Sequence, residues 1–127
     1  MNRENVSSPS PWEPVVGFSR AVRVGNQVFF AGTLDTGADA RPVGRTAYDQ
    51  TKNIFARFER ILQGLGGSME SIVRTRMYVL DRSDVADISM AHAELFATIR
   101  PAATMLLVAG FVGEGFFVEI EADAILE

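Results

Sequence analysis

Two stretches of this sequence place charged side chains at every second position, the spacing that puts them on one face of a β-strand. In the stretch VEIEADA, Glu119, Glu121 and Asp123 alternate with small or apolar residues, and in SIVRTRMYVL, Arg74 and Arg76 do the same. Carboxylates and guanidinium groups that face one way can pair as ions. A carboxylate among them can instead act as a general acid or base.

The remaining residue types leave few other routes to catalysis. The chain has no cysteine and a single histidine, which excludes disulfides, zinc fingers, thiol nucleophiles and multi-histidine metal sites. His92 falls on the apolar side of a predicted helix, and without a nucleophile partner it is interpreted as a core or interface residue. Ser19 does not lie in a G-x-S-x-G motif. We therefore expect any general acid or base to be a carboxylate.

Composition limits the class of protein and its partners. The chain has 127 residues, of which 47% are apolar and 22% charged, and its net charge is −4. These values are typical of one folded domain, and they disfavour a nucleic-acid partner because such proteins carry a basic surface. No stretch approaches the roughly 20 apolar residues of a membrane span, and the amino terminus has no signal-peptide core. The sequence predicts a cytoplasmic protein without a membrane partner.

Periodicity predicts the elements that position the charged residues. Apolar residues spaced for one helix face predict helices over 46–64 and from Ser83 or Asp84 to about 98. Strand patterns predict a hairpin over 18–32 that turns at Gly25-Asn26, and strands over 71–80, 104–109 and 116–125. The order β-β-α-β-α-β-β predicts an α+β fold, a single sheet with two helices packed on one face.

The first fourteen residues have a different character. They contain three of the five prolines, which favour extended backbone, so residues 1–14 are predicted to form an extended arm before a domain over 15–127. Trp12 either anchors this arm or is loosely packed.

The sheet face away from the helices has two possible environments. It is either solvated, as is common in antiparallel sheets, or buried against further copies of the chain. The second suits a domain this small, and the arginines suit interfacial pairing because the guanidinium binds carboxylates bidentately.

Four segments in order resemble the RidA (YjgF) family, often labelled endoribonuclease L-PSP. They are GFSRAVRVGNQVFFAG, SIVRTRMYVLDRSDV, RPAATML and VEIEADA. The resemblance spans about residues 17–126. It implies a chorismate-mutase-like fold and a homotrimer with clefts between subunits. In members of known activity, these clefts hydrolyse reactive imines or enamines derived from amino acids, releasing ammonia without metal or organic cofactor.

The resemblance assigns roles to three residues. It places Phe18 on the cleft wall in place of a family tyrosine, and Gly32 where backbone groups approach the ligand. It matches Glu119 to the carboxylate that positions or activates water. The alternative for Glu119 is a structural ion pair with Arg74 or Arg76.

The sequence departs from the family at the position that binds the substrate carboxylate. Where the family has Pro-Ala-Arg, this chain has Pro101-Ala102-Ala103, so the guanidinium is absent. Arg100 and Arg20 are possible substitutes, although an odd offset along extended backbone turns a side chain to the opposite face. The neighbours Thr104 and Met105 indicate a less charged pocket.

Two functions from different classes remain open. The first is an enzyme that hydrolyses a small imine, enamine or related metabolite in an intersubunit cleft, using Glu119 and backbone donors. The second is a non-catalytic binding or regulatory module that keeps the cleft, which the missing arginine favours. A third function, RNA cleavage, is disfavoured by the acidic charge balance.

Overall fold

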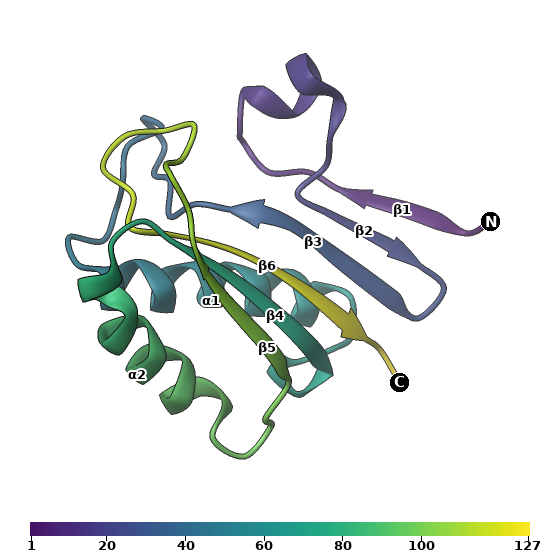
Figure 1. Ribbon diagram of the computed structural model, residues 1–127. Coiled ribbons are helices and arrows are strands. Elements are labelled where there is room, and N and C mark those ends of the chain that lie inside the picture. Colours follow the sequence, from purple (N-terminus) through teal and green to yellow (C-terminus); the bar gives the residue numbers. More distant parts are fainter.

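A computed structural model describes residues 1–127 and shows one six-stranded sheet with two long helices on the same face (Figure 1). The strands lie in the order β1-β2-β3-β6-β4-β5, so the last strand of the chain lies in the middle of the sheet. Neighbouring strands are antiparallel except β4 and β5, which are parallel and are connected through helix α2. The predicted fold class is confirmed.

The elements follow in the order β-β-β-α-β-α-β-β. The helices and strands are β1 (Arg3–Val6), β2 (Ala21–Val24), β3 (Gln27–Thr33), α1 (Ala47–Gly64), β4 (Ile72–Val79), α2 (Val85–Phe96), β5 (Ala102–Leu107) and β6 (Val118–Ile125). The predicted hairpin turn between β2 and β3 is confirmed, and Gly25 takes the positive φ of 61° that this turn requires. None of the helices is long and apolar enough to cross a membrane.

Helix α1 begins and ends where the sequence predicts. Thr46 caps it by accepting a hydrogen bond from the backbone N–H of Asp49 at 3.0 Å, which satisfies a donor that has no partner inside the helix. Beyond its end, Gly66 has a φ of 87°, a left-handed conformation that stops helices. The buried face of α1 carries Phe55 and Phe58, which pack on the sheet.

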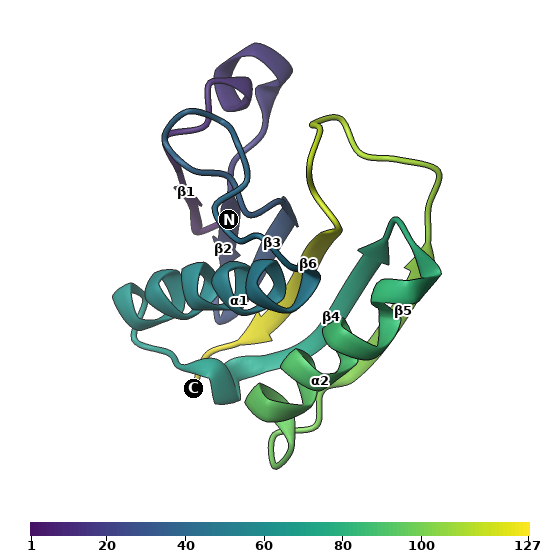
Figure 2. The same ribbon diagram turned by 90° about the vertical axis from the view of Figure 1, so that its left-hand side faces the viewer.

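The core lies between the two helices and the sheet (Figure 2). Strand β6 contributes the four buried residues that its alternation predicts, Val118, Ile120, Ala122 and Ala124. The ring of Phe30 on β3 stacks on Phe58 at 4.3 Å between centroids. Because alternate residues of β6 are fixed in this core, the intervening carboxylates must face away from the helices.

Two features of the sheet differ from the sequence predictions. Residues 3–6 of the predicted arm form an additional strand, β1, which pairs with β2, and a π-helical turn follows at Glu13–Gly17. In the stretch SIVRTRMYVL the alternation places Val73 on the core side with Thr75 and Met77, but Val73 is 43% exposed because β4 changes register between Ile72 and Arg74. The division into residues 1–14 and 15–127 stays a prediction, and Trp12 is exposed.

Strand β3 contains a second irregularity close to the predicted site. Phe30 lies opposite Ala122, but Thr33 lies opposite Ile120, so two residues of β3 correspond to one residue of β6. This is the count of a β-bulge, which bends a strand and often re-aims a side chain beside a functional site. Ala31 and Gly32 are the two residues that lie opposite the single residue Glu121.

Candidate functional site

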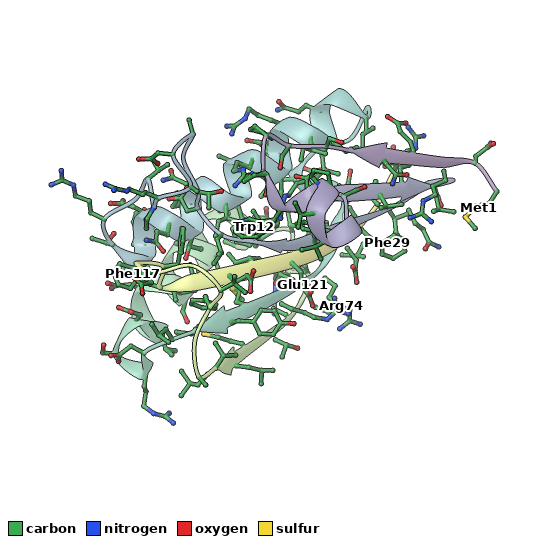
Figure 3. The ribbon with its side chains drawn as sticks, turned by 90° about the horizontal axis from the view of Figure 1, so that it is seen from above. Met1, Trp12, Phe29, Arg74, Phe117 and Glu121 are labelled. Carbon is green, nitrogen blue, oxygen red and sulfur yellow. The ribbon has the colours of Figure 1, made fainter.

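The charged face of the sheet contains a ladder of ion pairs between β4 and β6. Arg74 lies 3.8 Å from Asp123, and Arg76 lies 3.3 Å from Asp123 and 3.6 Å from Glu121, measured between nitrogen and oxygen. Tyr78 donates a hydrogen bond of 2.8 Å to Glu121. Figure 3 shows Arg74 and Glu121 projecting from neighbouring strands. These side chains are partly exposed, so each pair contributes little to the stability of one chain.

Glu119 is excluded from this ladder. Its carboxylate is half-buried and has neither a hydrogen bond nor an ion pair within the chain, although Tyr78 lies opposite on β4. Burial raises its pKa, Arg20 lowers it and Glu121 raises it again. Within one chain Glu119 forms no ion pair with Arg74 or Arg76, because the strand register pairs both arginines with other carboxylates. A pair with an arginine of another subunit stays an alternative.

Gly32 lies directly against Glu119. A β-carbon placed on Gly32 would lie 3.3 Å from both Cδ and Oε2 of Glu119, which is tighter than an ordinary contact. The bulge in β3 therefore presents bare backbone to the carboxylate. A ligand that approaches Glu119 meets peptide groups here in place of a side chain.

Arg20 lies on the other side of the bulge and is only 7% exposed. Its Nη1 donates to the carbonyl of Gly32 at 2.9 Å and to Oγ1 of Thr33 at 3.0 Å. Its Nη2 lies 3.8 Å from Oε2 of Glu13. Because its donors are committed to protein groups, Arg20 is not free in this conformation to bind a ligand carboxylate.

Phe18 completes this group of residues. The guanidinium carbon of Arg20 lies 5.3 Å from the centre of its ring, within the range of a cation–π contact. Phe18 also lines an open groove of about 750 Å³ beneath the amino-terminal segment, together with Phe29, Val22 and the serines of that segment. Of the eight predicted site residues, one chain thus brings four together: Phe18, Arg20, Gly32 and Glu119.

The other four predicted residues lie at the far edge of the sheet, on or just before β5. They are Arg100, Ala103, Thr104 and Met105. Thr104 lies opposite Arg76 and shares the charged face, whereas Ala103 and Met105 lie opposite Thr75 and Met77, on the helix side. Arg100 is exposed and has a positive φ of 54°. Strand β4 separates β5 from β6, so these residues do not reach Glu119 of the same chain.

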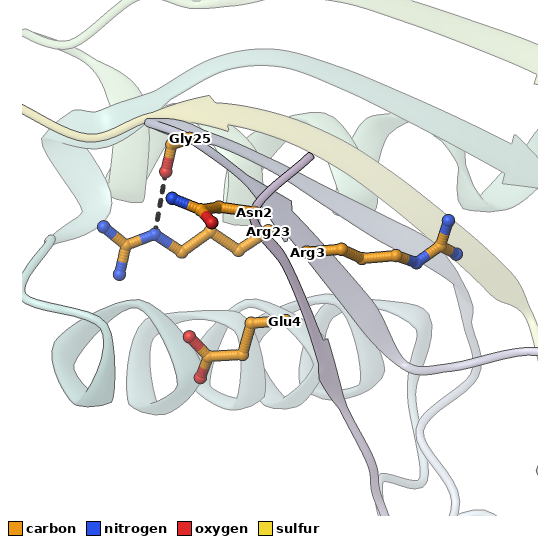
Figure 4. A pocket seen from close by; sticks show the side chains of 5 residues that line it. All are labelled: Asn2, Arg3, Glu4, Arg23 and Gly25. Atoms are coloured by element: carbon orange, nitrogen blue, oxygen red, sulfur yellow. Dashed lines mark hydrogen bonds between the residues drawn. The ribbon is translucent and has the colours of Figure 1, made fainter.

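A second, smaller hollow of about 320 Å³ lies at the start of β1 (Figure 4). Its lining is polar, and Nε of Arg23 donates to the carbonyl of Gly25 at 2.9 Å. None of the predicted site residues borders it. No three acidic or histidine side chains gather closely enough anywhere in the chain to hold a metal ion.

His92 occupies the position predicted for a core histidine. Its Nε2 lies 2.9 Å from the hydroxyl of the buried Thr75, and its ring packs against Phe55 and Phe96. Burial lowers its pKa, which favours the neutral ring. The residue belongs to the interface between α2 and the sheet and does not contact the Glu119 group.

Glu13 and Ser8 belong to this site although sequence reasoning did not select them. Glu13 is buried, pairs with Arg20, and accepts hydrogen bonds from the backbone and hydroxyl of Ser8. Both residues lie in the proline-rich segment, where no periodicity marks a buried side. An acidic residue just before an apolar pair, Val15 and Val16, was the one available signal.

Comparison with known proteins agrees with this fold. Residues 8–126 match the family model described as Endoribonuclease L-PSP. A crystal structure from Mycobacterium tuberculosis, described as a member of the highly conserved YjgF/YER057c/UK114 family, is 39% identical with a TM-score of 0.88, covering 98% of this chain and 100% of that one. The architecture is therefore that of a YjgF-type α+β protein.

Two further relatives are similar over most of their length. An uncharacterized protein of Streptomyces coelicolor is 38% identical over 119 residues, covering 94% of this chain and 89% of the relative. A protein of Dermatophagoides farinae named 2-iminobutanoate/2-iminopropanoate deaminase is 24% identical over 123 residues, covering 96% and 95%. The chain belongs to the endoribonuclease L-PSP family, which is also called the YjgF or RidA family, and some members of this family are imine deaminases.

Proposed function

We propose that this protein hydrolyses a small reactive imine or enamine, derived from an amino acid or a related metabolite, in a cleft between the subunits of a homotrimer. The observation that carries the proposal is the half-buried Glu119 carboxylate, which has no protein partner and whose pKa is raised by burial. A carboxylate with a raised pKa can exchange protons nearer neutral pH than an ordinary glutamate. The deaminase name of a relative that spans nearly the whole chain supports the same reaction.

The chemistry needs one water molecule and no redox partner. Glu119 takes a proton from water as the oxygen bonds to the imine carbon, and passes this proton to the imine nitrogen to give a neutral carbinolamine. Glu119 then takes the hydroxyl proton as the C=O bond forms and gives it to the nitrogen as the C–N bond breaks. Imine and water thereby become ketone and ammonia, and Glu119 is again a carboxylate. Backbone groups at Gly32 lie beside Glu119 and are available to orient the reacting atoms.

The separation of the predicted site residues supports a cleft between subunits. Within one chain, the Glu119 group and the residues of β5 lie on different parts of the sheet. Strand β5 is an edge strand whose Leu106 and Leu107 are exposed, so its pairing groups and apolar side chains are available to a second chain. If β5 of one subunit docked beside the Glu119 group of the next subunit, all eight predicted site residues would lie in one cleft.

We expect binding of the substrate to need a substrate carboxylate less than it does in relatives that have an arginine in place of Ala103. Ala103 cannot bind an anion, Arg20 is committed to protein acceptors, and Phe18 contributes an apolar wall. The groove beside Phe18 offers hydroxyl and aromatic groups to an uncharged substrate side chain. We expect such a side chain to be accepted.

A direct test measures ammonia release from freshly generated 2-aminoacrylate and from larger imines. We expect wild type to exceed buffer and Glu119→Gln to lose at least about tenfold in kcat/KM, the smaller end of the range for a general acid or base. Glu121→Gln is the matched control because its carboxylate belongs to the ion-pair ladder. No release by wild type, together with a gain in Ala103→Arg, would reject native deaminase activity.

The missing arginine favours a second candidate function, a binding or regulatory module that uses the same cleft. Small carboxylates and aromatic metabolites would be screened by thermal shift, followed by analysis of the ligand. A compound that stabilises the protein and is recovered unchanged favours binding over catalysis. The cytoplasmic location and the absence of a nucleic-acid partner stay predictions of the same proposal.

A further inference from the structure

Arg20 links the amino-terminal segment to the backbone beside Glu119. On one side, its Nη1 donates to the Gly32 carbonyl and the Thr33 hydroxyl, both at the end of the β3 bulge. On the other side, its Nη2 lies 3.8 Å from Glu13, and its Nε donates to the Ser8 hydroxyl at 3.5 Å. The guanidinium thus bridges two segments that no sheet hydrogen bonds connect directly.

At one end of this bridge, Arg20 binds Gly32, the residue beside which the Glu119 carboxylate lies. Gly32 carries the carbonyl that Arg20 holds, and the Glu119 carboxylate lies beside the same residue, where an added β-carbon would come within 3.3 Å of its Cδ and Oε2. A shift of the Gly32 peptide would therefore move the surface against which the Glu119 carboxylate packs. Site geometry must be held within about 0.5 Å to remain productive, which requires such support.

Arg20 interacts electrostatically with two carboxylates, those of Glu13 and Glu119. Arg20 is almost fully buried and has one carboxylate partner in Glu13, at ion-pair distance, and a second carboxylate nearby in Glu119. Opposite charges attract most strongly when neither is already neutralised, particularly away from water. The negative charge of the Glu13 carboxylate offsets part of the attraction between Arg20 and Glu119.

We propose that Glu13 and Arg20 form a positioning pair for Glu119, in which Arg20 fixes the backbone of the bulge and Glu13 offsets the charge of Arg20. The inference rests on the proposed role of Glu119. It makes the amino-terminal segment part of the site even though this segment supplies no reacting group. It also gives Arg20 a role that differs from binding a ligand.

Three other titratable groups lie around the pair, and they are unchanged in each of the variants below. Burial is the main cause that lowers the pKa of the Arg20 guanidinium, and the positive charge of Arg57 on α1 lowers it further. Glu121 of β6 raises the pKa of Glu119, and the phenol of Tyr78 on β4 lies beside both carboxylates. None of them contacts Glu13 within ion-pair distance.

The test follows the titration of the Glu119 side-chain carboxyl by carbon NMR, with the signal assigned from its absence in Glu119→Gln. In Glu13→Gln the full charge of Arg20 acts on Glu119, so we expect the midpoint to move to lower pH. In Arg20→Gln that charge is gone, so we expect it to move to higher pH. Glu4→Gln, an exposed change on β1, leaves the midpoint unchanged.

The opposite signs separate this proposal from simple loosening of the segment. Loosening exposes Glu119 to water in both variants and moves both midpoints to lower pH, which would overturn the proposal, as would no movement in Glu13→Gln. Because the proposal and loosening both predict a lower midpoint in Glu13→Gln, the upward shift in Arg20→Gln decides between them. If Arg20→Gln does not fold, Arg20→Met removes the same charge and is expected to give the same upward shift. The titration needs no turnover, so loss of the proposed deaminase activity in wild type would leave this result standing.

Discussion

The pairing register of β6 gives two of its glutamates, Glu119 and Glu121, different environments. Glu121 faces Arg76 and Tyr78 and is held by both, whereas Glu119 faces the bulge and has no partner. Identical side chains two residues apart therefore have different environments, one structural and one available for proton transfer. The alternation of the sequence predicts that both face outward, but it does not predict which of them is paired.

A prediction at the residue scale that is independent of function concerns the half-buried His92. Burial lowers the pKa of His92 below its value in the unfolded chain, near 6.5. A depressed pKa contributes stability that is present above the unfolded value and is lost as pH falls through the folded value. We expect the stability of wild type to fall as pH decreases below about 6.5.

The measurement is the thermal unfolding midpoint from pH 8 to pH 5 for wild type and His92→Phe. The phenyl ring preserves packing against Phe55 and Phe96 but cannot gain a proton. We expect the variant to show a shallower decline over this range, even where its absolute stability is lower. Equal declines in the two proteins would contradict a buried neutral histidine.

At the scale of elements, the sequence predicted both helices, the hairpin and the inward face of β6 because each buries a periodic set of side chains. It did not predict β1, since RENV has no alternation and becomes a strand only by pairing with β2. The alternation holds from Arg74 onward but not at Val73, because the bulge between Ile72 and Arg74 adds one residue there. The two groups of site residues were predicted by resemblance, but their separation within one chain depends on strand order.

Helix α1 also holds the start of β6 through one buried amide. The side chain of Gln50 accepts from the backbone N–H of Phe117 at 2.9 Å and donates to the carbonyls of Gly44 at 3.1 Å and Gly115 at 3.2 Å. Phe117 is two residues before Glu119, so this amide fixes where the strand that carries the carboxylate begins. The helix thereby positions the site from the opposite face of the sheet.

Replacing this amide tests that connection. Gln50→Ala leaves three backbone groups without their partner, and we expect it to cost about 1 to 3 kcal/mol in the free energy of unfolding. Gln63→Ala, an exposed change on the same helix, is expected to cost less than about 0.5 kcal/mol. Urea denaturation of both variants gives the comparison. Similar losses in the two variants would show that the amide does not stabilise this junction.

At the scale of the whole molecule, one sheet face is covered by helices and the other is not (Figures 1 and 2). The uncovered face combines the ion-pair ladder with exposed apolar residues, among them Phe29 and Leu106. The attraction between the charges of a partly exposed ion pair becomes stronger when water is removed around it. This combination suits a face that meets other copies of the chain.

The oligomeric state tests this arrangement. Light scattering is expected to give a mass three times that of the 13.9 kDa chain. Leu106→Asp places a charge on the outward face of β5 and is expected to yield monomers. Met90→Asp is the matched control because both side chains are 54% exposed, but Met90 lies on α2. A monomeric wild type, or dissociation of both variants alike, would contradict association through β5.

Strand β1 has a consequence for how far such association can go. It forms the second edge of the sheet, has only four residues, and bears Arg3 and Glu4 in exposed positions. Short, charged edges resist the addition of further strands. A chain that associates through β5 therefore has no equivalent edge at β1 to which a further chain could add. Strand-by-strand growth of the sheet into a fibril is disfavoured for this reason.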